Sequence, residues 1–420
     1  MHTLQQLRSG ELKGLKRIKI SENLTEFPEE IFTLADSLEI LDLSHNSLCS
    51  IPKNISKLSK LKIAFFSNNL FTSVPSEFKE CDSLYMLGLK ANQIEEFAED
   101  ILPLSISWLI LTDNQISALP DSMGELSKLQ KCALAGNKIE RLPQSMKECQ
   151  NLELIRLSAN QLQEIPSWLL KLPKLSWLAF SGNPCVNTPK FELNSVDYKE
   201  LELGKLLGEG ASGEIFKAYS KELEKSVAIK FFKGAVTSDG YAKDEMNACL
   251  GVGSHENLIS AIAKIKGHER LGLLLEYIPS EFKNLGNPPN FDTCTRDTYA
   301  DDLAFSVQTI IKVAKAIASA SAHMHEKNLM HGDLYAHNIL IHKDNRCYLG
   351  DFGAASFYDA KIDSFEKIEV RAFGCLLEDM LLRCSQKENL EYEKLLQLKE
   401  SCMSENVEQR PFFSQMNFSY

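Results

Sequence analysis

An asparagine recurs along the first half of this chain at a nearly constant interval, and this spacing constrains the fold more than any other sequence feature. Successive asparagines lie 22 or 23 residues apart, and each ends a frame of the form L-x-x-L-x-L-x-x-N. The eight positions are Asn23, Asn46, Asn69, Asn92, Asn114, Asn137, Asn160 and Asn183. A single frame cannot bury its own leucines, whereas stacked copies bury them against one another. The spacing therefore predicts a curved solenoid in which each frame contributes one short strand.

The residues around each frame agree with this arrangement. The asparagine side chain carries both a donor and an acceptor, so we expect it to bond to the backbone where each coil turns. In five of the units a proline follows six residues after the asparagine, and it prevents the strand from continuing. The pattern resembles a leucine-rich repeat array of about eight repeats over residues 15–185. We assign residues 1–190 to this α/β solenoid.

The outward-facing strand positions of the solenoid are rich in aliphatic and aromatic side chains. These positions are Ile63, Phe65, Met86, Trp108, Ile110, Leu154 and Trp177. Apolar side chains exposed in one stripe are typical of a protein-binding surface. We therefore expect the concave face to bind a protein, either a substrate or a regulator. The alternative is that these side chains only pack on one another along the strands.

The repeat disappears near residue 197, and we assign residues 191–420 to a second domain. Its first chemical signal is GEGASGEI at residues 208–215, in which Gly208, Gly210 and Gly213 form a GxGxxG motif. Glycines let backbone amides approach phosphate oxygens because no Cβ intervenes. A dinucleotide-binding loop has the same spacing but opens a helix. Since EIFKAYS favours a strand, a loop that folds over nucleotide phosphates fits better.

Two further segments supply a cation and an acid. VAIK at residues 227–230 places Lys230 at the end of an apolar strand, where it can pair with nucleotide phosphates. Glu245, in YAKDEMNACL, is its candidate partner on a following helix, and the neighbouring Asp244 would face elsewhere on that helix. Taken alone, VAIK could also be a surface lysine near an unrelated acid.

The strongest signal is HGDLYAHN at residues 331–338, followed by DFG at residues 351–353. Asp333 and Asn338 are five residues apart, and Asp351 lies 18 residues beyond Asp333. Asp333 can accept a hydroxyl proton, while Asn338 and Asp351 can hold Mg²⁺ through the hard oxygen ligands that it prefers. Transfer of an anionic phosphoryl group depends mostly on positioning and on charge neutralisation. These residues therefore predict phosphoryl transfer.

In order, these motifs resemble the protein kinase signature set, over about residues 198–415. The resemblance implies a two-lobed α+β domain that uses ATP and Mg²⁺. In such a domain Lys230 pairs with Glu245 and with the nucleotide phosphates. Asp333 orients the attacking hydroxyl and takes its proton, and Asn338 and Asp351 bind Mg²⁺.

The same resemblance assigns the apolar strand at residues 271–279 to the nucleotide site. Leu275 would lie behind the adenine, and the backbones of Glu276 and Ile278 would offer it hydrogen bonds. Phe352 and His331 would stack to join the two lobes. Together with the repeats, the chain is similar to soluble leucine-rich-repeat kinases of the bacterial sort.

Three departures from the kinase pattern change the expectation. Gly332 replaces an arginine that usually grips a phosphate on the activation loop, so switching by phosphorylation of that loop is not expected. No APE motif follows DFG, and only 18 steps lead from Asp351 to Glu369, which leaves Arg410 without an assigned partner. Tyr335 stands where serine/threonine kinases usually have lysine.

Two rival interpretations follow from these departures. A short segment after DFG also resembles small-molecule kinases of the aminoglycoside and choline type. An inactive ATP-binding scaffold is the third possibility. The chain nevertheless has all five residues to which the resemblance assigns chemistry, namely Lys230, Glu245, Asp333, Asn338 and Asp351. The complete glycine loop, VAIK and the attached solenoid favour a protein kinase, and we expect serine or threonine as its acceptor. The polar insert at residues 282–302 either walls the substrate groove or forms a surface loop.

Charge, apolar runs and cysteine content indicate the kind of partner and the compartment to expect. The net charge of −11 disfavours binding to nucleic acid or to an anionic membrane surface. No apolar run approaches the ~20 residues that cross a bilayer, and the N-terminus lacks the apolar core of an export signal. The eleven cysteines include no CxxC pair, which favours a reducing compartment. We expect a soluble cytoplasmic protein, although an effector secreted into a host would show the same features.

Overall fold

The structure is a computed structural model that describes residues 1–189, 191, 194–210, 212–234, 237, 239–362 and 364–418. The chain forms two compact units, Met1–Leu172 and Pro173–Tyr420. We refer to them as the repeat unit and the C-terminal unit.

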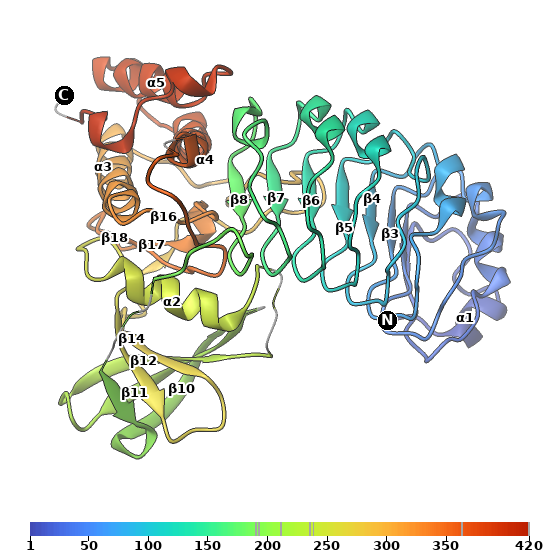
Figure 1. The fold of residues 1–420 in the computed structure, drawn as a ribbon, viewed down its shortest axis with the longest axis horizontal. Helices are drawn as coiled ribbons and strands as arrows, with labels where there is room; N and C mark the ends of the chain where they lie inside the picture. The colour runs from blue at the N-terminus through green and yellow to red at the C-terminus, as the bar shows by residue number, and fades with distance from the viewer. Residues whose placement is uncertain are drawn as a thin grey trace. The chain divides into compact units, whose positions relative to one another are not determined.

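The repeat unit is a stack of coils, each with one short strand (Figure 1). Helix α1 (Leu4–Arg8) precedes the strands β1 (Arg17–Lys19), β2 (Ile40–Asp42), β3 (Ile63–Phe65), β4 (Met86–Gly88), β5 (Trp108–Ile110), β6 (Lys131–Ala133) and β7 (Leu154–Arg156). Neighbouring strands pair in parallel, so that equivalent frame positions stand side by side, as Leu87 does with Leu109. The returning side of the coils holds the 3-10 turns η1 (Glu29–Leu34), η2 (Ile55–Lys57), η3 (Ser76–Glu80), η4 (Asp121–Glu125), η5 (Gln144–Glu148) and η6 (Leu169–Lys171). The predicted solenoid is confirmed.

The repeated asparagines bond successive coils to one another. Nδ2 of Asn160 donates to the carbonyl of Leu157 in its own coil at 3.0 Å and to that of Leu134 in the preceding coil at 2.9 Å. Its Oδ1 accepts from the backbone N–H of Ile139 at 3.0 Å. Equivalent bonds are made by Asn46, Asn69, Asn92, Asn114 and Asn137. The expected bonding to the backbone is confirmed.

The apolar stripe expected on the outward strand positions is mostly covered. Ile63, Met86, Trp108, Leu154 and Trp177 are buried, whereas Phe65 and Ile110 are partly exposed. The Nζ atom of Lys131 lies 4.1 Å from the ring centroid of Trp108. The expectation of exposure is therefore wrong for the five buried positions, and for Trp108 the alternative, packing along the strands, fits.

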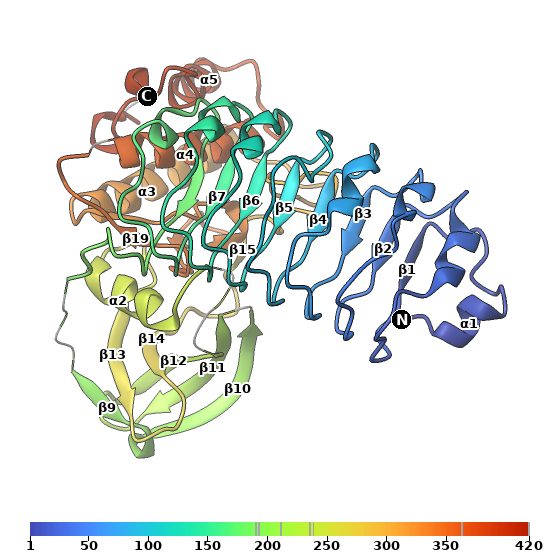
Figure 2. The ribbon, with the colours of Figure 1, turned by 45° about the vertical axis from the view of Figure 1, so that its right-hand side comes forward.

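The C-terminal unit begins with one further strand, β8 (Trp177–Ala179), and continues into a six-stranded sheet (Figure 2). The sheet order is β10-β11-β12-β14-β13-β9. Its strands are β9 (Ser195–Asp197), β10 (Leu201–Glu209), β11 (Gly213–Ser220), β12 (Lys225–Phe232), β13 (Ala261–Lys266) and β14 (Gly272–Glu276). Alternate residues of β12, namely Val227, Ile229 and Phe231, enter the core of this lobe. Helix α2 (Ala242–Val252) follows β12 in the chain.

The remainder of the C-terminal unit is mainly helical. Its helices are α3 (Val307–His325), α4 (Ser364–Leu382) and α5 (Leu390–Cys402). Short strands form two small sheets, one from β15 (Lys283–Asn284), β17 (Ile339–Ile341) and β18 (Cys347–Leu349), the other from β16 (Leu329–Met330) and β19 (Ser356–Phe357). A sheet-rich lobe followed by a helical lobe confirms the predicted two-lobed α+β architecture.

The repeat pattern and the packing divide the chain at different places. The last asparagine frame ends at Asn183, and the sequence predicts a boundary at residue 190, whereas the division between the compact units falls between Leu172 and Pro173. The difference arises because the coil that contains β8 makes its packing contacts inside the C-terminal unit, as described below. The boundary at residue 190 remains a prediction of where the repeat sequence stops. Within that join, Lys190, Glu192 and Leu193 lie outside the described residues.

In the described ranges, no helix has both the length and the apolar character that crossing a membrane would require. All eleven cysteines are free thiols, and most are buried.

Candidate active site

The three glycines of the GxGxxG motif lie at the hairpin between β10 and β11. The backbone N–H of Gly210 donates to the carbonyl of Gly213 at 2.9 Å. A Cβ on Gly213 would collide with the backbone oxygen of Phe231 on β12, whereas one on Gly208 or Gly210 would meet no atom within 4 Å. Gly213 is therefore needed for packing, and the space beside the other two glycines is open to a ligand. Ala211, within the motif, lies outside the described residues.

Lys230 and Glu245 form a buried ion pair between β12 and α2. Asp351 lies close by, with 3.9 Å between its Oδ1 and Nζ of Lys230. Burial opposes the positive charge of Lys230, but the carboxylates of Glu245 and Asp351 outweigh it and raise the pKa of Lys230. Lys230 is therefore held as a cation at a defined place.

The three glycines, Lys230 and Asp351 line a cleft of about 580 Å³. Its wall includes Gly208, Gly210, Gly213, Lys230, Leu275, Glu276, Ile278, Asn338 and Asp351. The N–H of Glu276 donates to the carbonyl of Ser260 at 3.0 Å, so only the carbonyl of Glu276 could serve a bound base. A cleft of this size with a few convergent polar groups is typical of a small-molecule site.

Asp333 and Asn338 are joined by a pair of hydrogen bonds. Nδ2 of Asn338 donates to Oδ2 and to the carbonyl oxygen of Asp333, both at 2.9 Å. Because both bonds use Nδ2, the amide oxygen of Asn338 is left to bind a cation. Asp351 lines the same cleft as Asn338. Its side chain is 54% exposed, and its backbone has a φ of 58°. A non-glycine residue rarely adopts this left-handed conformation, and such residues cluster at functional sites.

Glu369 on α4 holds the loop that carries Asp333. Its carboxylate accepts from the backbone N–H of Gly332 at 2.8 Å and of His331 at 3.2 Å, and it bonds to Nε2 of His325 at 2.8 Å. Burial alone would raise the pKa of Glu369, but the bond to His325 and those from the loop outweigh it, so its pKa lies below the usual value. Sequence reasoning gave Glu369 no role of its own. The signal was present as an acid within the apolar helix EVRAFGCLLEDML.

His331 connects this loop to the DFG segment. Its Nε2 atom donates to the carbonyl of Gly350 at 3.0 Å, and its Nδ1 atom accepts from the N–H of Asp333 at 3.2 Å. The rings of His331 and Phe352 are in contact, with centroids 5.4 Å apart, but they are tilted by 49° rather than stacked in parallel.

The insert at residues 282–302 reaches the same loop. Asp297 is buried, accepts from the backbone N–H of His337 at 3.1 Å and bonds to its ring Nδ1 at 2.7 Å. Burial disfavours the charged imidazole, but Asp297 outweighs this effect and raises the pKa of His337. Arg296 is anchored to α4 through Glu378 and Asp379, at 2.8 and 2.6 Å. This part of the insert packs against the site and is not a free surface loop.

Comparisons with known families agree with both halves of the structure. A family model described as protein kinase domain matches residues 201–370, and one described as leucine rich repeat matches residues 36–94. The chain therefore carries a leucine-rich repeat region and a protein kinase domain.

Curated relatives support the kinase assignment. The chain is 30% identical over 168 residues to fibroblast growth factor receptor 1 of Xenopus laevis and 26% identical over 168 residues to that of Pleurodeles waltl. The matched segment makes up 37% of this chain and 21% of each receptor, so the chain spans only about a fifth of these relatives. Neither relative bears on the expected likeness to bacterial kinases, which stays a prediction.

Proposed function

We propose that this protein transfers the γ-phosphoryl group of ATP to a hydroxyl group of a protein. The observation that carries the proposal is a cleft lined by Lys230, Asn338 and Asp351. Directly behind these residues, Glu245 pairs with Lys230, and Asp333 is bonded to Asn338. Such a set offers a fixed cation for phosphates, oxygen ligands for a metal and a carboxylate for the acceptor.

The residues present suit Mg-ATP. A cleft of about 580 Å³ lies within the range of small-molecule sites, and its polar groups are a lysine, an amide oxygen and an exposed carboxylate. The amide oxygen of Asn338 and the carboxylate of Asp351 would hold Mg²⁺, since hard oxygen donors are its preferred ligands. Mg²⁺, when bound, supplies positive charge that offsets the charge of the phosphates.

Each residue has a separate task in the proposed transfer. Lys230, kept cationic by Glu245, would pair with nucleotide phosphates and fix their position. Asp333, whose Oδ2 is oriented by Asn338, would accept a hydrogen bond from the acceptor hydroxyl and then its proton. Glu369 would act only by holding the backbone of the loop in place.

Further parts of the proposal concern the acceptor and the setting. The glycine loop, VAIK and the attached repeats favour a protein acceptor, and we include serine or threonine as the residue modified. The repeats would recruit the substrate or a regulator through their concave face, since leucine-rich repeats in general suggest protein binding. Free cysteines in this number suit a reducing compartment, so we place the protein in the cytoplasm.

Incubating the purified chain with Mg-[γ-³²P]ATP tests the activity. Phosphate on the chain itself or on a generic protein such as casein supports a protein kinase, and phosphoamino acid analysis then decides between serine or threonine and tyrosine. Phosphate on an aminoglycoside or on choline instead supports the small-molecule rival. Nucleotide binding without any transfer supports an inactive scaffold.

Recruitment is tested by removing residues 1–172, which spares the coil that contains β8. We expect transfer to casein to persist, because the catalytic groups all lie in the C-terminal unit. Transfer to the physiological target should fall. Equal rates on that target with and without the repeats would show that the repeats do something else.

A further inference from the structure

The last coil of the repeat sequence, residues 173–183, packs within the C-terminal unit; we name it the terminal coil. Its Trp177 lies against the loop that carries Asp333. The indole Nε1 donates to the carbonyl of Leu334 at 3.1 Å, and the indole ring stacks on Tyr335 with centroids 4.4 Å apart and planes 6° apart. Trp177 and Tyr335 are both buried. Contact between aromatic rings adds to the stability that burial of their surface provides.

The terminal coil also approaches the loop at Gly332. A Cβ on Gly332 would lie 2.6 Å from the carbonyl oxygen of Leu178 and 2.7 Å from that of Ala354. The terminal coil and Ala354 together thus leave no room for a side chain at position 332, where the family has an arginine. An arginine at position 332 and the terminal coil in its observed place would therefore exclude each other.

The segment after DFG is tied to the terminal coil as well. The backbone N–H of Phe180 donates to Oγ of Ser356 at 3.0 Å, and the ring of Phe180 stacks on Phe365 with centroids 5.0 Å apart. The hydroxyl of Tyr358 bonds to Nδ1 of His325 at 2.8 Å. Ser356, Tyr358 and Ser364 are the hydroxyl residues between Asp351 and Glu369. Two of these three are therefore engaged in the packing.

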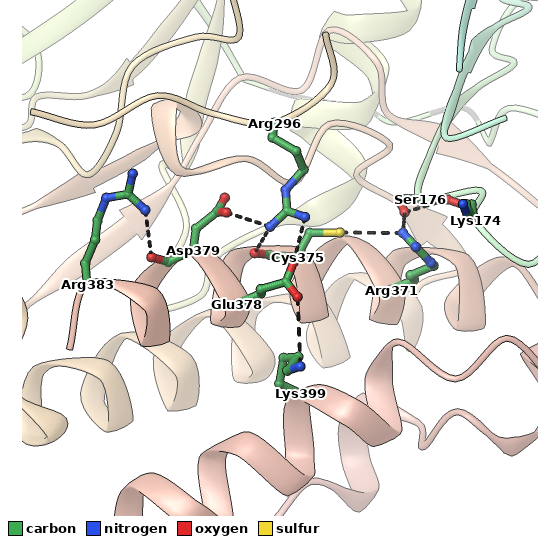
Figure 3. A network of polar contacts seen from close by, with 9 residues as sticks. All are labelled: Lys174, Ser176, Arg296, Arg371, Cys375, Glu378, Asp379, Arg383 and Lys399. Atoms are coloured by element: carbon green, nitrogen blue, oxygen red, sulfur yellow. Dashed lines mark hydrogen bonds and ion pairs between the residues drawn. The ribbon is translucent and has the colours of Figure 1, made fainter. Parts of the chain in front are cut away.

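Helix α4 and the C-terminal region hold the other end of the terminal coil. Arg371 on α4 donates to Oγ of Ser176 at 2.8 Å, and Figure 3 shows this bond on the same helix whose Glu378 and Asp379 bind Arg296 of the insert. Arg410 donates to the carbonyl of Pro173 at 2.7 Å.

The far end of the terminal coil touches α2, which carries Glu245. A Cβ on Gly182 would lie 2.6 Å from Oδ2 of Asp244 and 2.7 Å from the ring of Tyr241, the residue that precedes α2. Asp244, which the sequence directs away from Lys230, thus faces the terminal coil. One short segment contacts α2, the loop of Asp333, the segment after DFG and α4.

We propose that the terminal coil replaces a phosphorylated activation segment and holds the kinase domain in its active arrangement, with Trp177 as the positioning residue for the loop of Asp333. This inference rests on the proposed kinase activity. With the terminal coil in this role, a short segment after DFG is sufficient. An arginine that binds a phosphate is then not needed at position 332. The kinase would need no phosphate on residues 351–369, because the terminal coil makes the contacts that order the loop.

The test compares three variants of the full chain. W177A removes the ring stack and the bond to Leu334, W177F keeps an aromatic ring, and W168A removes a tryptophan from the repeat unit as a matched control. We expect W177A to lower kcat on casein by about 10- to 100-fold, since a displacement of about 1 Å can cost 10²-fold. The Kd for Mg-ADP and the KM for ATP should stay within about twofold, and W177F should restore most of kcat. W168A should match wild type.

Hydrogen exchange of residues 331–338, measured on the same variants, separates this inference from the proposed function. We expect faster exchange in W177A than in W168A. If wild type transfers no phosphate, the proposed function fails, while the exchange comparison still decides whether Trp177 holds the loop. Equal exchange and equal kcat in W177A and W168A would overturn the inference.

A glycine pair provides the second test, which decides the matter if W177A loses nucleotide binding through misfolding. Gly182 and Gly136 both have a φ of 72° and both precede the asparagine of their frames. G182A and G136A therefore introduce a similar backbone strain, and G182A in addition presses on Asp244 of α2. We expect G182A alone to raise the KM for ATP and to lower kcat; equal effects of the two variants would contradict the role of the coil.

Phosphatase treatment completes the test. After removal of phosphate, confirmed by mass spectrometry, wild-type turnover on casein should be unchanged. A requirement for phosphate on Ser356, Tyr358 or Ser364 would overturn the inference.

Discussion

The carbonyl oxygen of Leu178 occupies the space that a side chain on Gly332 would need, 2.6 Å from the position of its Cβ. Gly332 also has a φ of 73°, which disfavours any other residue. Both constraints act on the residue directly before Asp333. A substitution of Gly332 is therefore expected to displace Asp333 as well as to lower the stability of the fold.

The first prediction concerns G332A and G332R. We expect G332A to lower the free energy of unfolding by about 1–3 kcal/mol and to reduce kcat, and G332R to be worse in both. G10A serves as control, because Gly10 has a φ of 79° but has no atom within 4 Å of its Cβ position. Urea unfolding and casein phosphorylation measure the two effects. A fully active G332R would contradict this prediction, because the terminal coil would then accommodate a side chain at position 332 without loss of activity.

The second prediction concerns D333N. The amide cannot take a proton from the acceptor, so we expect kcat to fall by about 10²–10⁴-fold. The affinity for Mg-ADP should remain, because Asp333 does not line the cleft around Lys230 and Asp351. Steady-state kinetics and a fluorescent ADP titration measure both quantities. Wild-type turnover in D333N would discard the assignment of Asp333.

The third prediction concerns the pH dependence of stability through Glu369. Its pKa in the folded protein lies below the ordinary value for a glutamate, because bonds to its carboxylate outweigh the effect of burial. Such a group adds stability that is present above about pH 4.5 and is lost as the pH falls through its folded-state pKa. The gap in unfolding free energy between wild type and E369Q should therefore shrink on acidification.

Urea titrations between pH 3 and pH 7 measure this gap, with E400Q on the exposed face of α5 as control. E400Q should show no pH-dependent gap of comparable size. A gap between wild type and E369Q that does not change with pH would refute the role given to the Glu369 charge.

The fourth prediction concerns the asparagines of the repeat unit. N160A leaves two backbone carbonyls and one backbone N–H without the bonds described above, in a position that is 1% exposed. At about 1–3 kcal/mol for each unsatisfied buried group, we expect a loss of at least ~3 kcal/mol in the repeat unit. Q161A changes the exposed neighbour and should cost less than about 0.5 kcal/mol. Similar losses in both variants would show that the asparagine bonds contribute little.

Much of this structure could be predicted from the sequence because its determinants are local or periodic. The spacing of Asn46, Asn69 and their equivalents dictates the coils, and the apolar run that ends in Lys230 predicts β12. The kinase motifs are also short and ordered, so the groups that line the cleft could be named before their geometry was known.

The features that the sequence left open depend on contacts between distant residues. Nothing in the frame around Trp177 distinguishes it from earlier frames, yet its ring packs on Tyr335, more than 150 residues away. The role of Glu369 depends in the same way on the loop at Gly332. The burial of Ile63 and Met86 depends on neighbouring side chains, and alternation along a three-residue strand does not reveal it.

The bonding of Arg410 has a consequence for how the terminal coil responds to its surroundings. Arg410 donates to the carbonyls of Lys367, Ser404 and Pro173, and it has no carboxylate among these partners. Neutral acceptors are neither protonated by mild acid nor neutralised by counter-ions. The hydrogen bonds between Arg410 and these carbonyls should therefore persist at high ionic strength and in mild acid. Both conditions weaken the ion pairs that ordinarily hold an activation segment in place.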